Sequence, residues 1–84
     1  MSPKWPLYEQ IALLADFPDE RLKKGDIVRL VEFLQSPKVG LPNGYCVEAF
    51  NALGDTIAVF VVKEDEPEAL TMHDILTKRT RETI

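Results

Sequence analysis

The sequence predicts a mainly β domain of the α+β class, in which an N-terminal helix precedes a small curled antiparallel sheet or barrel. Three segments, 25–33, 44–50 and 54–62, begin with glycine and continue with β-branched and aromatic residues, as strands do after turns. A chain of 84 residues is long enough for one hydrophobic core. We therefore expect a single domain over 1–84, with a helical lead-in at 1–22, a barrel at 23–70 and a polar tail at 71–84.

The predicted N-terminal helix covers residues 7–16. Leu7, Ile11 and Leu14 recur at i, i+4 and i+7, which places them on one apolar helix face. Pro18 ends this helix, because the residue before a proline is kept out of the α region. We expect Phe17 and Leu22 to cover the core beyond that point.

The connections between the strands are marked by glycine and proline. Residues 35–44 contain two prolines and two glycines, which predicts a long loop, and residues 51–55 predict a hairpin turn at Gly54. Segment 56–62 is almost entirely apolar, which predicts a central strand covered on both faces. Thr71 precedes Asp74 by three residues, which predicts the capped start of a short C-terminal helix.

Composition favours a soluble, cytoplasmic protein. Hydrophobic residues make up 45% and charged residues 29% of the chain, enough for both a core and a solvated surface. Cys46 is the only cysteine, so an internal disulfide is impossible, which fits a reducing compartment. No apolar run has the length that crosses a bilayer, and we expect no membrane contact.

Several positions resemble an uncharacterised bacterial family of domains of unknown function, over about residues 7–70. The shared positions are apolar anchors and turn residues: Leu7, Ile11, Ala12, Leu14, Pro18, the run 22–26, Val31, Glu32, Tyr45, Val47, Glu48, Phe50, the run 54–59 and Leu70. The resemblance implies an SH3-like barrel of about five strands. It also implies a protein partner, of the kind found in toxin–antitoxin or immunity pairs, and it brings no catalytic or ligand-binding residues.

The sequence contains no recognisable catalytic or metal-binding motif. His73 and Cys46 are the only histidine and cysteine, whereas a zinc site needs about four such ligands. The acidic run 64–68 lacks the glycine and alternating oxygen ligands of a calcium loop, and no phosphate-binding glycine motif occurs. We therefore predict that the protein is not an enzyme and uses no cofactor and no metal.

The leading functional hypothesis is a protein–protein interaction module, acting as a monomer or a weak homodimer. The candidate partner-binding surface comprises Trp5, Arg29, Val39, Leu41 and Tyr45. Trp5 has two interpretations, an aromatic contact for a partner peptide or packing over an end of the barrel. Homodimers would form through an open sheet edge.

The alternative hypothesis is a nucleic-acid-binding barrel. In that case Lys23, Lys24, Arg29 and the basic tail would contact phosphates, while an exposed Tyr45 would stack on a base. The formal net charge of −4 opposes this hypothesis, because it repels a phosphate backbone. We therefore expect a protein partner and no nucleic acid.

Overall fold

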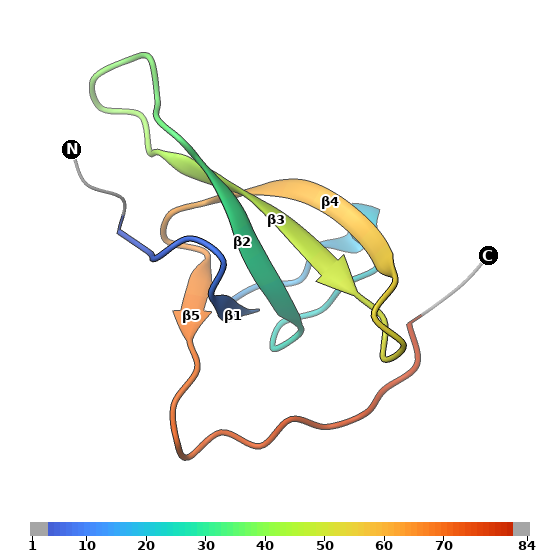
Figure 1. Cartoon of the computed structure of the whole chain (residues 1–84). Helices are drawn as coiled ribbons and strands as arrows, with labels where there is room; N and C mark the ends of the chain where they lie inside the picture. The colour runs from blue at the N-terminus through green and yellow to red at the C-terminus, as the bar shows by residue number, and fades with distance from the viewer. Residues whose placement is uncertain (1–3, 82–84) are drawn as a thin grey trace.

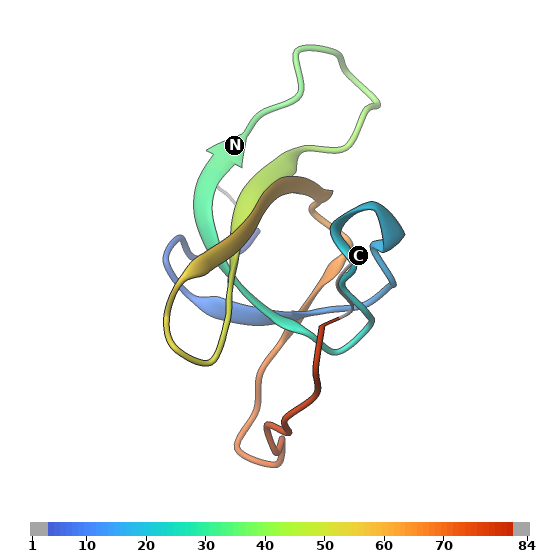
Figure 2. The ribbon, with the colours of Figure 1, turned by 90° about the vertical axis from the view of Figure 1, so that its right-hand side faces the viewer.

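The computed structural model describes residues 4–81, which form one antiparallel sheet of five strands and no α-helix. The elements are β1 (Gln10–Leu13), the short 3-10 helix η1 (Pro18–Glu20), β2 (Ile27–Leu34), β3 (Gly44–Phe50), β4 (Thr56–Lys63) and β5 (Pro67–Ala69). The strand order is β4-β3-β2-β1-β5. Figures 1 and 2 show that the sheet curls around a common interior.

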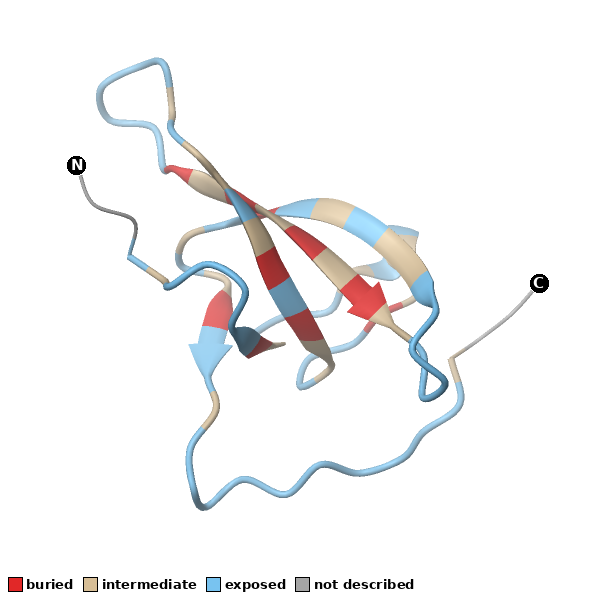
Figure 3. Cartoon of the chain, viewed as in Figure 1, coloured by how far each residue is buried: buried red, intermediate tan, exposed pale blue. Residues whose placement is uncertain are grey.

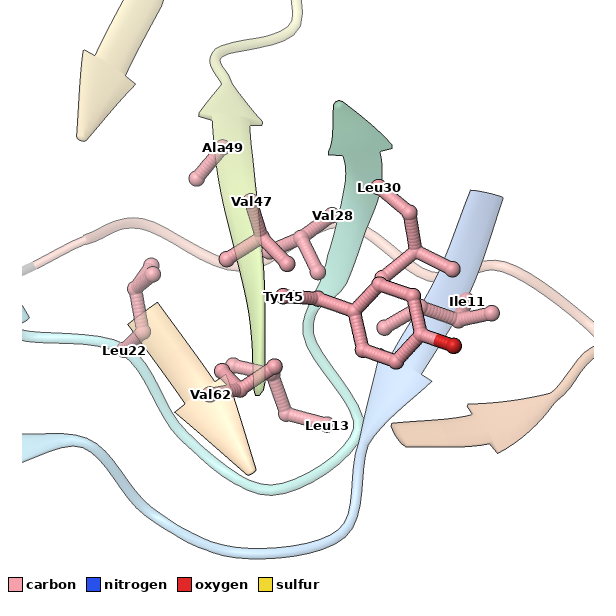
Figure 4. Close-up of a cluster of buried hydrophobic side chains, with 9 residues drawn as sticks. All are labelled: Ile11, Leu13, Leu22, Val28, Leu30, Tyr45, Val47, Ala49 and Val62. Atoms are coloured by element: carbon pink, nitrogen blue, oxygen red, sulfur yellow. The ribbon is translucent and has the colours of Figure 1, made fainter. Parts of the chain in front are cut away.

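The core lies inside this curl. Along β3, side chains alternate between the interior and the outer face, and Tyr45, Val47 and Ala49 point inward. An extra residue in β2, where the pairing with β3 shifts between Leu30 and Glu32, helps the sheet to bend. Figure 4 shows the buried apolar side chains together: Ile11, Leu13, Leu22, Val28, Leu30, Tyr45, Val47, Ala49 and Val62.

The predicted helix at residues 7–16 is wrong, and the α+β class is therefore wrong for the described chain. Tyr8 has a φ of +68°, outside the right-handed helical region, and β1 begins at Gln10. Ile11 pairs with Val28 on one side and with Ala69 on the other. A strand between two neighbours has partners for its backbone on both sides, whereas a helix of this length is marginal without extensive packing.

The prediction of β4 as the central strand is also wrong. β4 lies at one edge of the sheet and pairs only with β3 among residues 4–81. Figure 3 shows that its surface alternates between exposed and partly buried residues along most of its length. Its apolar side chains therefore do not all lie in the interior.

The predicted C-terminal helix does not form, although the hydrogen bonds of a helix start are present. The Thr71 N–H donates to Asp74 Oδ2 over 2.6 Å, and the His73 N–H donates to Thr71 Oγ1 over 3.2 Å. Beyond this turn, the described tail runs without regular structure below the sheet in Figure 1. Arg79 forms an ion pair with Asp26, which holds the tail against the domain.

The expected connections are observed. Residues 51–55 form the turn between β3 and β4, with the Asn51 N–H donating to the Asp55 carbonyl over 2.9 Å and Gly54 at a φ of +90°. Residues 35–43 form the long loop that projects at the top of Figure 1. Leu22 is buried and Phe17 packs against the core, as expected. Residues 4–81 include no helix with the length and apolar character needed to cross a bilayer.

Candidate functional site

The outer face of β4 exposes large apolar side chains. Val59 and Val61 are 57% and 58% exposed, although both belong to a regular strand. They lie opposite Glu48 and Cys46 of β3, so their side chains project from the outer face. No proline occurs in β4, and no charged residue occurs before Lys63 at its end. We call Val59, Val61 and the adjacent free side of the strand the β4 edge.

The hydrogen-bond phase of β4 follows from one contact beside the strand. The Glu64 N–H donates to the Asn43 carbonyl over 3.0 Å, so these two residues form a hydrogen-bonded pair. In an antiparallel ladder such pairs recur at every second residue, which places Val62 and Phe60 in hydrogen-bonded pairs with β3. The backbone N–H and C=O groups of Val59 and Val61 therefore point away from β3, toward the free side.

A groove of about 250 Å³ lies beside the β4 edge. Phe60 and Val61 of β4 form one wall, and the η1 segment forms the other. The rings of Phe17 and Phe60 approach to 5.2 Å between centroids and give the groove an apolar contact. The opposite wall is acidic, because it carries Asp16, Asp19 and Glu20. The groove thus combines apolar rings and negative charge with strand backbone that is unpaired among the described residues.

Trp5 and Tyr45, two of the predicted site residues, are close together but serve the core. Tyr45, expected to be exposed, is 0% exposed, and its ring packs in a tilted arrangement against Phe33, with 5.3 Å between the ring centroids. Its hydroxyl accepts a hydrogen bond from the Trp5 N–H over 2.8 Å. The Trp5 indole Nε1–H donates to the Glu64 carbonyl over 2.8 Å. Trp5 therefore packs over an end of the sheet, the second of its two interpretations.

The other three predicted site residues lie apart from this pair. Arg29 is exposed on β2, opposite Glu48, with its guanidinium 5.5 Å from the centroid of the Phe50 ring. Val39 and Leu41 are exposed in the 35–43 loop, which borders a hollow of about 470 Å³. The structure thus does not gather the five residues into one surface.

The basic residues proposed for nucleic-acid binding are close to carboxylates or already bonded. The Lys24 N–H donates to Asp16 over 2.8 Å, and the Lys23 N–H donates to Asp26 over 2.7 Å. Arg79 Nε donates to the same Asp26 carboxylate over 2.8 Å. This turn is therefore of mixed charge.

The Asp26 carboxyl group has a pKa below its ordinary value. Partial burial acts to raise its pKa, but hydrogen bonds from Arg79 and the Lys23 N–H, with the charges of both residues, outweigh burial and lower it. Asp26 is thus held ionised in an ion pair with Arg79, and its role is structural. Within residues 4–81, no group of three or more His, Cys, Asp or Glu side chains could hold a metal ion.

The sequence analysis missed the β4 edge and its groove. The available signal was the nearly uncharged apolar run of 56–62, which is typical of a strand covered on both faces but fits an exposed edge equally well. The acidic residues of the η1 segment follow the predicted helix, and nothing in the sequence places them beside β4.

The fold and this surface define a small all-β domain whose antiparallel sheet has the edge strand β4 beside an acidic groove. The chain belongs to the DUF4926 family, described as a domain of unknown function, whose model matches residues 7–68. This match confirms the resemblance to an uncharacterised family. No curated protein and no solved structure matches the chain.

Proposed function

We propose that this domain is a non-enzymatic protein-interaction module and that the β4 edge is its binding surface. The observation that carries the proposal is the exposure of Val59 and Val61 beside strand backbone that has no partner within residues 4–81. Natural sheets usually protect such edges with charges, prolines or bulges, because an open edge pairs readily with another chain. The central part of β4, from Ala58 to Val62, has none of these protections.

The interior supports a binding role rather than a catalytic one. The domain core is apolar, and Asn43 is the only buried polar residue within 4–81. Its Oδ1 accepts the Ser36 N–H over 2.8 Å, so Asn43 stabilises the base of the 35–43 loop. The carboxylate of Asp26, which forms an ion pair with Arg79, holds the tail against the domain. Catalysis requires reactive groups that converge in a pocket, and these residues do not.

The experiment is affinity capture with the full tagged chain from nuclease-treated lysate of the native host. Bound proteins are identified by mass spectrometry, and the mass of the purified complex is measured by light scattering. A single protein partner in fixed stoichiometry would support the proposal. Capture of nucleic acid that moderate salt removes, or of no stoichiometric protein, would contradict it. The bacterial, antitoxin- or immunity-like role implied by the resemblance stays a prediction until that partner is identified.

A further inference from the structure

We propose that the β4 edge binds an extended segment of its partner as an added strand, and that this segment carries lysine or arginine side chains. The inference rests on the proposed function, because it names the partner chemistry for the same surface. It combines three features: the direction of the β4 backbone groups, the groove beside them and the charge of the groove wall.

The backbone of β4 is arranged for strand addition. Val59 and Val61 each direct an N–H and a C=O away from β3, whereas the intervening Phe60 is hydrogen-bonded to β3. The corresponding groups of Lys63 are already used, because its N–H donates to Glu66 Oε1 over 2.6 Å and its C=O accepts the Glu66 N–H over 3.0 Å. The pairing region is therefore centred on Phe60 and ends at this turn.

The groove lies beside the part of β4 where the added segment would pair, and its lining favours particular side chains. Alternate side chains of an added strand would lie beside Val59 and Val61 on the outer face, which favours β-branched residues. The other side chains would point to the groove, where Phe17 and Phe60 offer apolar contacts. Main-chain hydrogen bonds would supply affinity, and these alternating contacts would supply specificity.

Charge decides which segment fits. The far wall carries the carboxylates of Asp16, Asp19 and Glu20, and the chain as a whole has a net charge of −4. The chain's own basic tail already contacts the η1 segment, because the Arg81 guanidinium donates to the Glu20 carbonyl over 2.9 and 3.2 Å. A lysine or arginine from a partner would meet the acidic residues Asp19 and Glu20 at the same wall.

A second copy of the chain fits this edge poorly. Antiparallel pairing of two β4 strands about Phe60 would satisfy the backbone of Val59 and Val61. The same pairing would bring two acidic walls and two chains of charge −4 together. Like charges across an interface oppose association. The occupant that the charges favour is a basic segment of a different protein.

The test uses a phage-displayed library of random dodecapeptides, selected on the full-length protein. We expect the selected peptides to alternate β-branched residues with lysine or arginine. The best synthetic peptide is then titrated into the 15N-labelled protein, where the amides of Val59, Val61 and Glu20 should shift most. Selection of acidic peptides, selection of none, or shifts confined to the 35–43 loop would overturn the inference.

Protein variants test the outward backbone N–H of β4 and the acidic groove wall separately. Val61→Pro removes an outward N–H and should weaken peptide binding about tenfold or more, whereas Val61→Thr keeps that N–H and should change binding about twofold at most. Asp19→Asn combined with Glu20→Gln should weaken binding several-fold and reduce its salt dependence. Asp65→Asn combined with Glu68→Gln, two exposed positions outside the groove, is the matched charge control. Binding of the peptide by all four variants with the affinity of the wild type would overturn the inference.

A modified peptide gives the same answer without altering the protein. Methylating the peptide backbone nitrogens that face β4 should abolish binding, and methylating the alternate nitrogens should not. Equal affinity of the two peptides would overturn strand addition. The capture experiment decides the interaction role independently. A partner bound through another surface would leave that role standing, while strand addition and the assignment of the β4 edge would both fail.

Discussion

Tyr45 shows how one side chain joins the N-terminal segment to the core. Its ring is buried against Phe33, and its hydroxyl lies at the end of the sheet, where it accepts the Trp5 N–H. A buried tyrosine needs a partner for its hydroxyl, and the backbone of Trp5 provides it. Its place in an alternating strand favours an inward orientation, but its polar hydroxyl also suits a binding surface, and the prediction that it is exposed is wrong.

Replacing Tyr45 with phenylalanine should lower the free energy of unfolding by about 1 kcal/mol, because the Trp5 N–H loses its acceptor while the ring packing stays. Urea unfolding followed by Trp5 fluorescence measures the change. Tyr8→Phe is the matched control, since Tyr8 is 71% exposed, and it should leave stability unchanged. Equal stabilities of the two variants would contradict the role of the Tyr45 hydroxyl.

Asp26 should make stability depend on pH. Its pKa in the folded protein lies below the ordinary value of 3.8, so its contribution is fully present above that value and is lost as the pH falls through the folded pKa. Asp26→Asn should therefore lose less stability than the wild type on acidification below the ordinary value. Arg79→Gln should reduce the same dependence, because Arg79 supplies the ion pair. Urea unfolding at a series of pH values measures the pH dependence of the free energy of unfolding. The same pH dependence in all three proteins would refute the role of the Asp26–Arg79 ion pair.

The β1 strand shows why the helical pattern at residues 7–16 misled. Leu7, Ile11 and Leu14 satisfy a helical spacing, but Ile11 and Leu13 also satisfy the spacing of a strand with one buried face. Leu7 and Leu14 are exposed in the structure, so the helical face is not what the fold buries. The pairing with both β2 and β5 decides between the patterns, and it involves residues far along the chain.

The strands β2, β3 and β4 were predictable because their β-branched residues lie between clear turn signals. The order of these strands in the sheet was not predictable from the sequence. An apolar run such as that of β4 indicates a strand but does not say which neighbours cover it. The exposure of Val59 and Val61 depends on β4 being at an edge, which follows from the pairing of the whole sheet.

Proline substitutions in β4 should distinguish its two sides. Val62→Pro removes an N–H that bonds to β3 and should lower the free energy of unfolding by about 3 kcal/mol. Val61→Pro removes an outward N–H and should cost much less, since edge positions tolerate proline. Thermal or urea unfolding gives both values. A larger loss for Val61→Pro than for Val62→Pro would show that the hydrogen-bond phase is wrong.

The whole molecule is a curled sheet whose two edge strands follow each other in sequence. A short turn after Lys63 leads from β4 at one edge to β5 at the other, so the chain itself joins the two edges at one end. The η1 segment lies beside Phe60 and Val61 of β4 and forms the acidic groove there. This arrangement brings the early residues Asp16–Glu20 next to a late strand, which local sequence patterns cannot predict.

At the scale of the whole molecule, net charge should keep the domain monomeric. Sedimentation equilibrium in low salt should give a mass of about 9.5 kDa for the chain alone. Neutralising the groove with Asp19→Asn and Glu20→Gln should increase self-association, because it removes repulsion between two β4 edges. A stable wild-type dimer whose contact is β4 would contradict the assignment of a basic partner.

Amide hydrogen exchange along β4 in the free protein tests the central claim, an open β4 edge, most directly. We predict that the amides of Val59 and Val61 exchange quickly, whereas those of Phe60 and Val62 are protected by their bonds to β3. Protection of Val59 and Val61 should appear when the partner binds. If these two amides are already as slow as their neighbours in the free monomer, the edge is covered and the proposed binding surface is wrong.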